Sequence, residues 1–154
     1  MLTNRETSKQ TATLVATSAL AELARIRAFV TGFCRVATPL LAEEQTAALE
    51  LAVNEAAVNI MEHAYAGSPE GRIDLEARDH GDRIVIRLAH SGTGFRRSDV
   101  PEPVFDGTAD GGFGIFIIEQ SVDEVRYGTD GNGKQEVVLT KFKTAGKENT
   151  GGAE

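Results

Sequence analysis

Two neighbouring stretches of alternating apolar and polar residues constrain the fold most strongly. RIDLEAR (72–78) and RIVIRLA (83–89) are separated by a short turn around DHGD. Alternation with a period of two places every second side chain on the same face of a strand, and a short turn with a glycine joins strands that run in opposite directions. The pair therefore predicts a β-hairpin with one apolar face, which other elements must cover.

The rest of the chain supplies those elements. Ser18 is expected to cap a helix whose apolar residues recur at helical spacing up to Phe33, and a long alanine-rich second helix is expected at 42–64. A strand, a helix entered through glycines and a second hairpin are predicted at 11–16, 111–122 and 123–142. This order predicts an α+β fold, with helices on one face of a mixed, mostly antiparallel sheet.

Length and composition restrict the class of protein. A chain of 154 residues, 41% of them hydrophobic and 25% charged, is expected to form one soluble domain over 1–143, followed by a disordered tail at 144–154. No apolar run is long enough for a membrane span, and residues 1–10 have no signal-peptide core, so a cytoplasmic protein is expected. With a net charge of −7 and no basic run, direct binding of nucleic acid is not expected.

A stripe of polar side chains runs along the second helix. Glu55, Asn59 and His63 are spaced i, i+4, i+8 and therefore lie on one face. A carboxamide oxygen can bind Mg²⁺ while a carboxylate one turn away takes a proton from an incoming hydroxyl, an arrangement suited to phosphoryl transfer. A solvated polar face is the alternative, although mostly apolar residues surround the stripe.

Glycines mark two further segments. HSGTGF (90–95) leaves a predicted strand, and GGFG (111–114) opens a predicted helix. Glycines at a helix start expose N–H groups that, with the helix dipole, favour an anion. The alternative for both segments is a tight turn that binds nothing.

Together and in this order, these segments resemble the motifs of the GHKL ATPase superfamily, which includes gyrase, the Hsp90 chaperones, histidine kinases and the MutL repair proteins. NEAAVNIMEHAY (54–65) is similar to the N-box, and HSGTGF stands where the Asp-x-Gly-x-Gly box would be. The segment beginning GGFG at 111 is similar to the second glycine box. Within the superfamily, VDEVRY (122–127) favours the anti-sigma-factor serine kinases over histidine kinases, which carry a dimerisation helix pair that this chain has no room for.

The resemblance implies a Bergerat-type α/β sandwich that holds ATP and Mg²⁺ between helices and sheet. Glu55 falls where the family has its general base, and Asn59 where it has its magnesium ligand. Residues 95–110 correspond to the ATP lid. The residues expected to line the ATP site are Asn59, His63, His90, Gly92, Gly94, Phe95, Gly112, Phe113, Gly114 and Gln135.

The resemblance also implies partners. Members of this branch phosphorylate a serine of a small STAS-domain antagonist and otherwise hold a sigma factor inactive. They commonly pair through the sheet, so a homodimer is a further expectation for this chain.

Three departures from the family pattern concern the site. His90 replaces the aspartate that accepts a hydrogen bond from the adenine amino group, and only a neutral imidazole could substitute for it. The lid is acidic, with no Lys or Arg from Ser98 to Val125, so a phosphate-binding cation would have to be Arg96 or Arg97, or come from a partner. Lys134 and Gln135 replace a Gly-Thr pair, and a glutamine can still bond a base edge.

Two functions remain open from the sequence. An ATP-dependent serine/threonine kinase of the anti-sigma type is favoured by Glu55 and Asn59 together. A partner-binding anti-sigma module with a degraded nucleotide site and little or no kinase activity is favoured by His90 and the acidic lid.

Overall fold

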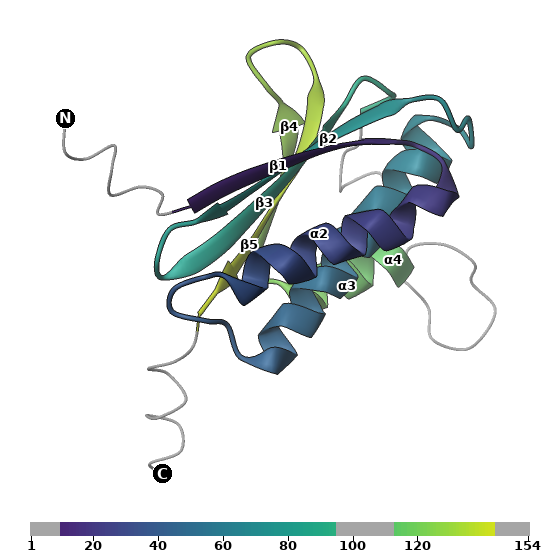
Figure 1. Ribbon diagram of the computed structural model, residues 1–154. Helices are drawn as coiled ribbons and strands as arrows, with labels where there is room; N and C mark the ends of the chain where they lie inside the picture. Colours follow the sequence, from purple (N-terminus) through teal and green to yellow (C-terminus); the bar gives the residue numbers. More distant parts are fainter. Residues whose placement is uncertain (1–9, 95–112, 144–154) are drawn as a thin grey trace.

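The computed structural model describes residues 10–94 and 113–143 and shows two layers, with helices packed on one face of a five-stranded sheet (Figure 1). The strands are β1 (Gln10–Thr17), β2 (Arg72–Asp79), β3 (Arg83–His90), β4 (Glu124–Thr129) and β5 (Gln135–Phe142). The helices are η1 (Leu20–Glu22), α2 (Leu23–Arg35), α3 (Glu43–Asn59), η2 (Ile60–Ala64) and α4 (Phe113–Ser121). The predicted α+β class and the order of elements are confirmed.

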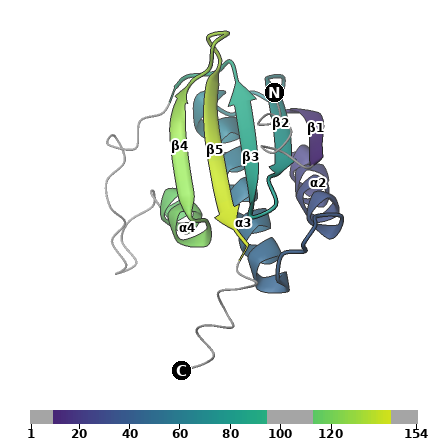
Figure 2. The ribbon, with the colours of Figure 1, turned by 90° about the vertical axis from the view of Figure 1, so that its left-hand side faces the viewer.

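The sheet has the order β1-β2-β3-β5-β4, which Figure 2 shows with the strands in front of α3. The hairpin predicted around DHGD pairs β2 with β3, and Gly81 in its turn has a φ of 96°. Among the described strands all four pairings are antiparallel, so the sheet contains no parallel pair where the sequence indicated a mixed, mostly antiparallel one. The strands β3 and β4 run in the same direction, but β5 lies between them and pairs antiparallel with both.

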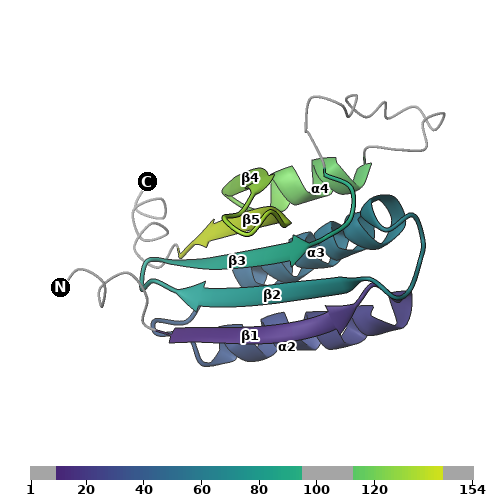
Figure 3. The same ribbon diagram turned by 90° about the horizontal axis from the view of Figure 1, so that it is seen from above.

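The core lies between the sheet and the helices, which Figure 3 shows beneath the sheet. Alternation in β2 and β3 turns Ile73, Leu75 and Leu88 inward, each at most 1% exposed. Small residues on α3, among them Ala52 and Ala56, let that helix pack closely against its neighbours. No helix in the described part of the chain is both long and apolar enough to cross a membrane.

One local expectation was wrong, and a second was correct in its bounds but not in its type of helix throughout. Ser18 does not cap a helix, because its hydroxyl donates to the Ser68 carbonyl oxygen (2.6 Å) and accepts from the Gly71 N–H (2.8 Å), which ties the end of β1 to the start of β2. The second long helix is not uniform either. It is α-helical to Asn59 and then continues as a π-helical turn over Ile60–Ala64, a wider turn often found next to functional sites. The expected tail at 144–154 lies outside the described residues.

Candidate functional site

Glu55 and Asn59 lie on the side of α3 that faces the start of α4. A Cβ placed on Gly114 would lie 3.1 Å from Oε1 of Glu55 and 3.6 Å from Oδ1 of Asn59. Both polar side chains are half-buried. The contact joins two segments that lie more than 50 residues apart in the sequence, and it brings a carboxylate, a carboxamide and the first turn of a helix together. Groups of these kinds suit phosphoryl transfer.

His63 does not continue this stripe. It lies in the π-helical turn η2, where the wider turn changes the angular spacing that an α-helix would give. Its side chain is exposed, and no hydrogen bond joins it to Glu55 or Asn59 in the described ranges. The prediction of a three-residue stripe therefore holds for Glu55 and Asn59 only. The end of η2 instead contacts the segment that follows β3.

That contact is with the first glycine segment, whose backbone is held by three hydrogen bonds. Ser91 N–H donates to the Tyr65 hydroxyl (2.9 Å), Gly92 N–H donates to Nδ1 of His90 (3.1 Å), and Thr93 N–H donates to the carbonyl oxygen of Ala64 (3.0 Å). A Cβ on Gly92 would lie only 2.5 Å from that same carbonyl oxygen, so the close approach requires glycine. Because these three N–H groups are already bonded within the protein, they are not free to bind the phosphates of a nucleotide.

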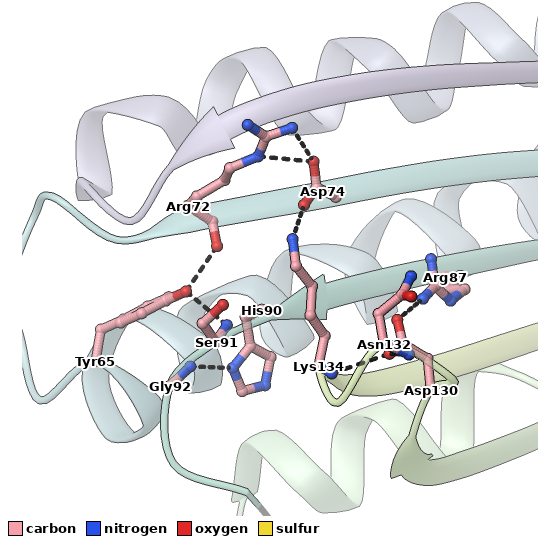
Figure 4. Close-up of polar contacts among 10 residues, drawn as sticks. All are labelled: Tyr65, Arg72, Asp74, Arg87, His90, Ser91, Gly92, Asp130, Asn132 and Lys134. Carbon is pink, nitrogen blue, oxygen red and sulfur yellow. Dashed lines mark hydrogen bonds and ion pairs between the residues drawn. The ribbon is translucent and has the colours of Figure 1, made fainter.

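His90 ends β3 on the face that the helices cover. It is 6% exposed and lies opposite Gln135 of β5 and Ile73 of β2 in the sheet register. Its ring meets the Tyr65 ring edge to face, with centroids 5.9 Å apart. Burial lowers the pKa of His90 below its ordinary value, so the imidazole is neutral at pH 7. Nδ1 accepts from the Gly92 N–H (Figure 4). The single proton of the neutral ring is therefore on Nε2.

Gln135 and Lys134, which follow one another, point to opposite sides of the sheet. A Cβ on Gly94 would lie 2.6 Å from Oε1 of Gln135, so the second glycine of the segment lies at this amide on the inner side. Lys134 instead pairs with Asp74 (Nζ–Oδ2 3.0 Å) on the outer face, as Figure 4 shows. Of the two residues that replace the family's Gly-Thr pair, only Gln135 lies on the inner side of the sheet, beside Gly94 and opposite His90.

Tyr65 is a site residue that sequence reasoning missed. Its hydroxyl donates to the Arg72 carbonyl oxygen (2.7 Å) while it accepts from Ser91, so one side chain links η2, β2 and the glycine loop. The signal was available, because Tyr65 is the last residue of the NEAAVNIMEHAY segment. The helical spacing of the polar stripe, at positions 55, 59 and 63, does not include it.

Other expected site residues are only partly covered by the structure. Phe113, the first residue of α4, is half-buried. Phe95, Gly112, the lid at 95–110 and its Arg96 and Arg97 lie outside the described residues.

The described residues fit the expected Mg²⁺ only if protein side chains supply few of its ligands. Among the described residues no group of three or more His, Cys, Asp or Glu side chains could hold a metal ion. Mg²⁺ at nucleotide sites is usually bound by one or two protein oxygens together with substrate phosphates and water, and the half-buried Asn59 carboxamide beside Glu55 suits that mode.

Comparison with known proteins identifies the family to which the chain belongs. Residues 16–141 match the family model described as a histidine kinase-like ATPase domain. Relatives include proteins named serine-protein kinase RsbW from Listeria innocua, 31% identical over 102 residues (61% of this chain, 64% of that protein), and from Bacillus licheniformis, 32% identical over 102 residues (61% and 62%). The matches thus span less than two thirds of the length of these curated relatives.

A solved structure shows the same fold at low identity. The crystal structure of the RsbU and RsbW domains of a Mycobacterium tuberculosis protein superposes with a TM-score of 0.62 and 17% identity, covering 88% of this chain and 33% of that one. The family model covers most of the chain, including both glycine segments and the polar residues of α3. This chain belongs to the histidine kinase-like ATPase domain family.

Proposed function

We propose that this chain binds a nucleoside triphosphate, which is ATP in the family to which it belongs, together with Mg²⁺. It transfers the γ-phosphoryl group to a serine of a STAS-domain antagonist, and otherwise holds a sigma factor inactive in the cytoplasm. The observation that carries the proposal is the contact of Gly114 with Glu55 and Asn59, which assembles a candidate base and a candidate metal ligand at a helix start. The relatives named serine-protein kinase RsbW support the choice of substrate class.

Each residue has a distinct role in this proposal. Glu55 accepts the proton of the attacking serine hydroxyl, which requires its carboxylate to be ionised and within hydrogen-bond reach of that hydroxyl. Asn59 holds the metal through Oδ1, and the bound Mg²⁺ neutralises charge on the phosphates. Gly114 keeps the first turn of α4 close to both side chains, because any larger side chain would press on Oε1 of Glu55.

A partner-binding module is the second candidate, and His90 favours it. Its acceptor nitrogen is engaged by the Gly92 N–H, so it cannot accept a hydrogen bond from the amino group of adenine in this conformation. A site weakened in this way would leave a protein that forms complexes and transfers no phosphate.

Phosphoryl transfer separates the two candidates. Purified protein is incubated with a STAS-domain antagonist and labelled nucleoside triphosphate, and phosphoserine is measured by mass spectrometry. The kinase proposal predicts transfer by the wild type and its loss in Glu55→Gln, with Mg²⁺–nucleotide affinity near wild type. Glu62→Gln is the matched control, because Glu62 is exposed on η2 and should leave transfer unchanged. A stable complex without any phosphoserine overturns the kinase proposal in favour of the binding module.

A further inference from the structure

The loop after β3 determines which hydrogen-bonding group His90 can present. Nδ1 is occupied by the Gly92 N–H at 3.1 Å, and the loop amides on either side are bonded to Tyr65 and Ala64. The ring cannot simply rotate to free Nδ1, because the buried imidazole also packs against the Tyr65 ring. The turn therefore fixes both the orientation of the imidazole and the position of its proton.

The free side of the imidazole is a donor. Figure 4 shows Nε2 directed away from the loop, and no hydrogen bond joins it to another residue in the part of the chain that the structure describes. Gln135 lies directly opposite on β5, at the short spacing of a cross-strand pair, and its Oε1 lies beside Gly94. The inner end of the sheet thus carries an N–H donor next to an amide that can accept.

This end of the sheet is where the proposed site would hold a base. Glu55, Asn59 and the start of α4 take the phosphate end, and the inner side chains at the ends of β3 and β5 remain for the other end of the nucleotide. A 6-aminopurine presents a donor, its amino group, at position 6, whereas a 6-oxopurine presents an acceptor, O6, next to the N1–H donor. A donor facing a donor leaves both groups unpaired, which costs binding free energy.

We propose that His90 is a specificity-determining residue whose Nε2–H, next to Gln135, selects 6-oxopurine nucleotides over adenine nucleotides. The proposal rests on the proposed nucleotide site and changes only the base that the site prefers. His90 donates to O6, and the Gln135 Oε1 accepts from N1–H. The Gly92 N–H acts through Nδ1 as the group that keeps the proton on Nε2.

The test compares three diphosphates by calorimetry on the full chain with Mg²⁺. ADP and IDP differ only at position 6 and in the N1 proton that follows from it, and GDP adds the 2-amino group. We expect IDP and GDP to bind the wild type at least about tenfold more tightly than ADP. Diphosphates are used so that no turnover disturbs the measurement.

Two variants of His90 that have nearly the same shape as each other test whether a donor at this position sets the preference. In His90→Asn the side-chain oxygen can accept from Gly92 N–H while the NH₂ group still donates, so the preference for IDP should persist. In His90→Asp both oxygens only accept, so the preference should invert towards ADP. Both residues suit a turn that bonds the N–H two positions on, and thermal melting checks that each variant is folded.

The outcomes separate this inference from the proposed function. Tighter binding of ADP than of IDP by the wild type overturns the inference and leaves the nucleotide site standing. Identical preferences in His90→Asp and His90→Asn would also overturn the inference and leave the nucleotide site standing. No measurable binding of any of the three diphosphates overturns the nucleotide site itself, and this inference with it.

Discussion

At the end of β3 a histidine occupies a position where the resemblance implies an aspartate, and the two residues share one function while differing in another. Like a carboxylate, the imidazole accepts the N–H two residues on and closes the turn at Gly92. Unlike a carboxylate, it then presents a proton to the site. A local turn can therefore persist while the chemistry of the same side chain reverses.

Burial of His90 should make folding stability depend on pH. The pKa values of His90 and His80 are both lowered in the folded protein, chiefly by burial. The unfolded chain therefore takes up these protons first, so the stability they contribute is complete above pH about 6.5 and falls as the pH decreases towards their folded values. Denaturant unfolding at pH 7.5 and 5.5 measures this loss.

The matched variant assigns part of that loss. We expect His90→Asn to lose less stability than the wild type over the same pH interval, because one of the two histidines is removed while the carboxyl groups that titrate remain. Equal losses in the two proteins would show that His90 does not change its protonation on unfolding.

Gly92 should be intolerant of any side chain. A Cβ there would lie 2.5 Å from the backbone oxygen of Ala64, which cannot move without disturbing η2. Gly92→Ala should cost about 1–3 kcal/mol of unfolding free energy. Gly32→Ala, within α2 and with no atom within 4 Å of the added carbon, is the control and should gain up to about 1 kcal/mol. Similar effects of the two substitutions would contradict the close approach at Gly92.

At the scale of elements, one buried ion pair joins three segments at the end of the sheet where β2 and β5 finish. Lys143 Nζ lies 2.9 Å from Oδ1 of Asp79, and these side chains are 3% and 1% exposed. Lys143 also donates to the Pro39 carbonyl oxygen, while the N–H groups of Thr38 and Gly81 donate to Asp79. Burial opposes ionisation of Asp79, but these hydrogen bonds outweigh it and hold the pKa below its usual value.

Removing one partner of this pair should be costly. Lys143→Met leaves a buried carboxylate uncompensated and should lower the unfolding free energy by about 3–5 kcal/mol. Lys134→Met breaks a pair with Asp74 whose side chains are 36% and 26% exposed, and it should cost less than about 1 kcal/mol. Denaturant unfolding compares the two variants. A loss below 1 kcal/mol in Lys143→Met would show that the buried pair contributes little.

At the scale of the whole molecule, periodicity and turn residues sufficed for the fold class and the order of elements, because β2 and β3 alternate buried and less buried residues and α2 has apolar residues at helical spacing. Two details depended on contacts distant in sequence. Ser18 has the features of a cap, yet its hydroxyl is taken by residues 68–71, and the π-helical turn over Ile60–Ala64 is coupled to the packing of Gly92 against Ala64. Local propensity contains no information about either partner.

The same distinction applies to the site. The spacing of Glu55 and Asn59 on one helix face was predictable, whereas their contact with Gly114 depends on how α4 packs against α3. The replacement of aspartate by His90 was visible in the sequence. Which ring nitrogen accepts from Gly92 became evident only from the geometry of the turn.

We propose that a magnesium nucleotide binds between α3, the start of α4 and the inner ends of β3 and β5. Hydrogen–deuterium exchange with and without saturating Mg²⁺–nucleoside triphosphate, with ATP and GTP in parallel, tests it most directly. We predict slower exchange in the first turn of α4 and around residues 55–65. We predict no change in β1 and α2, which line an open apolar groove of about 370 Å³ elsewhere on the molecule. Protection confined to β1 and α2, or none anywhere with either nucleotide, would contradict the account.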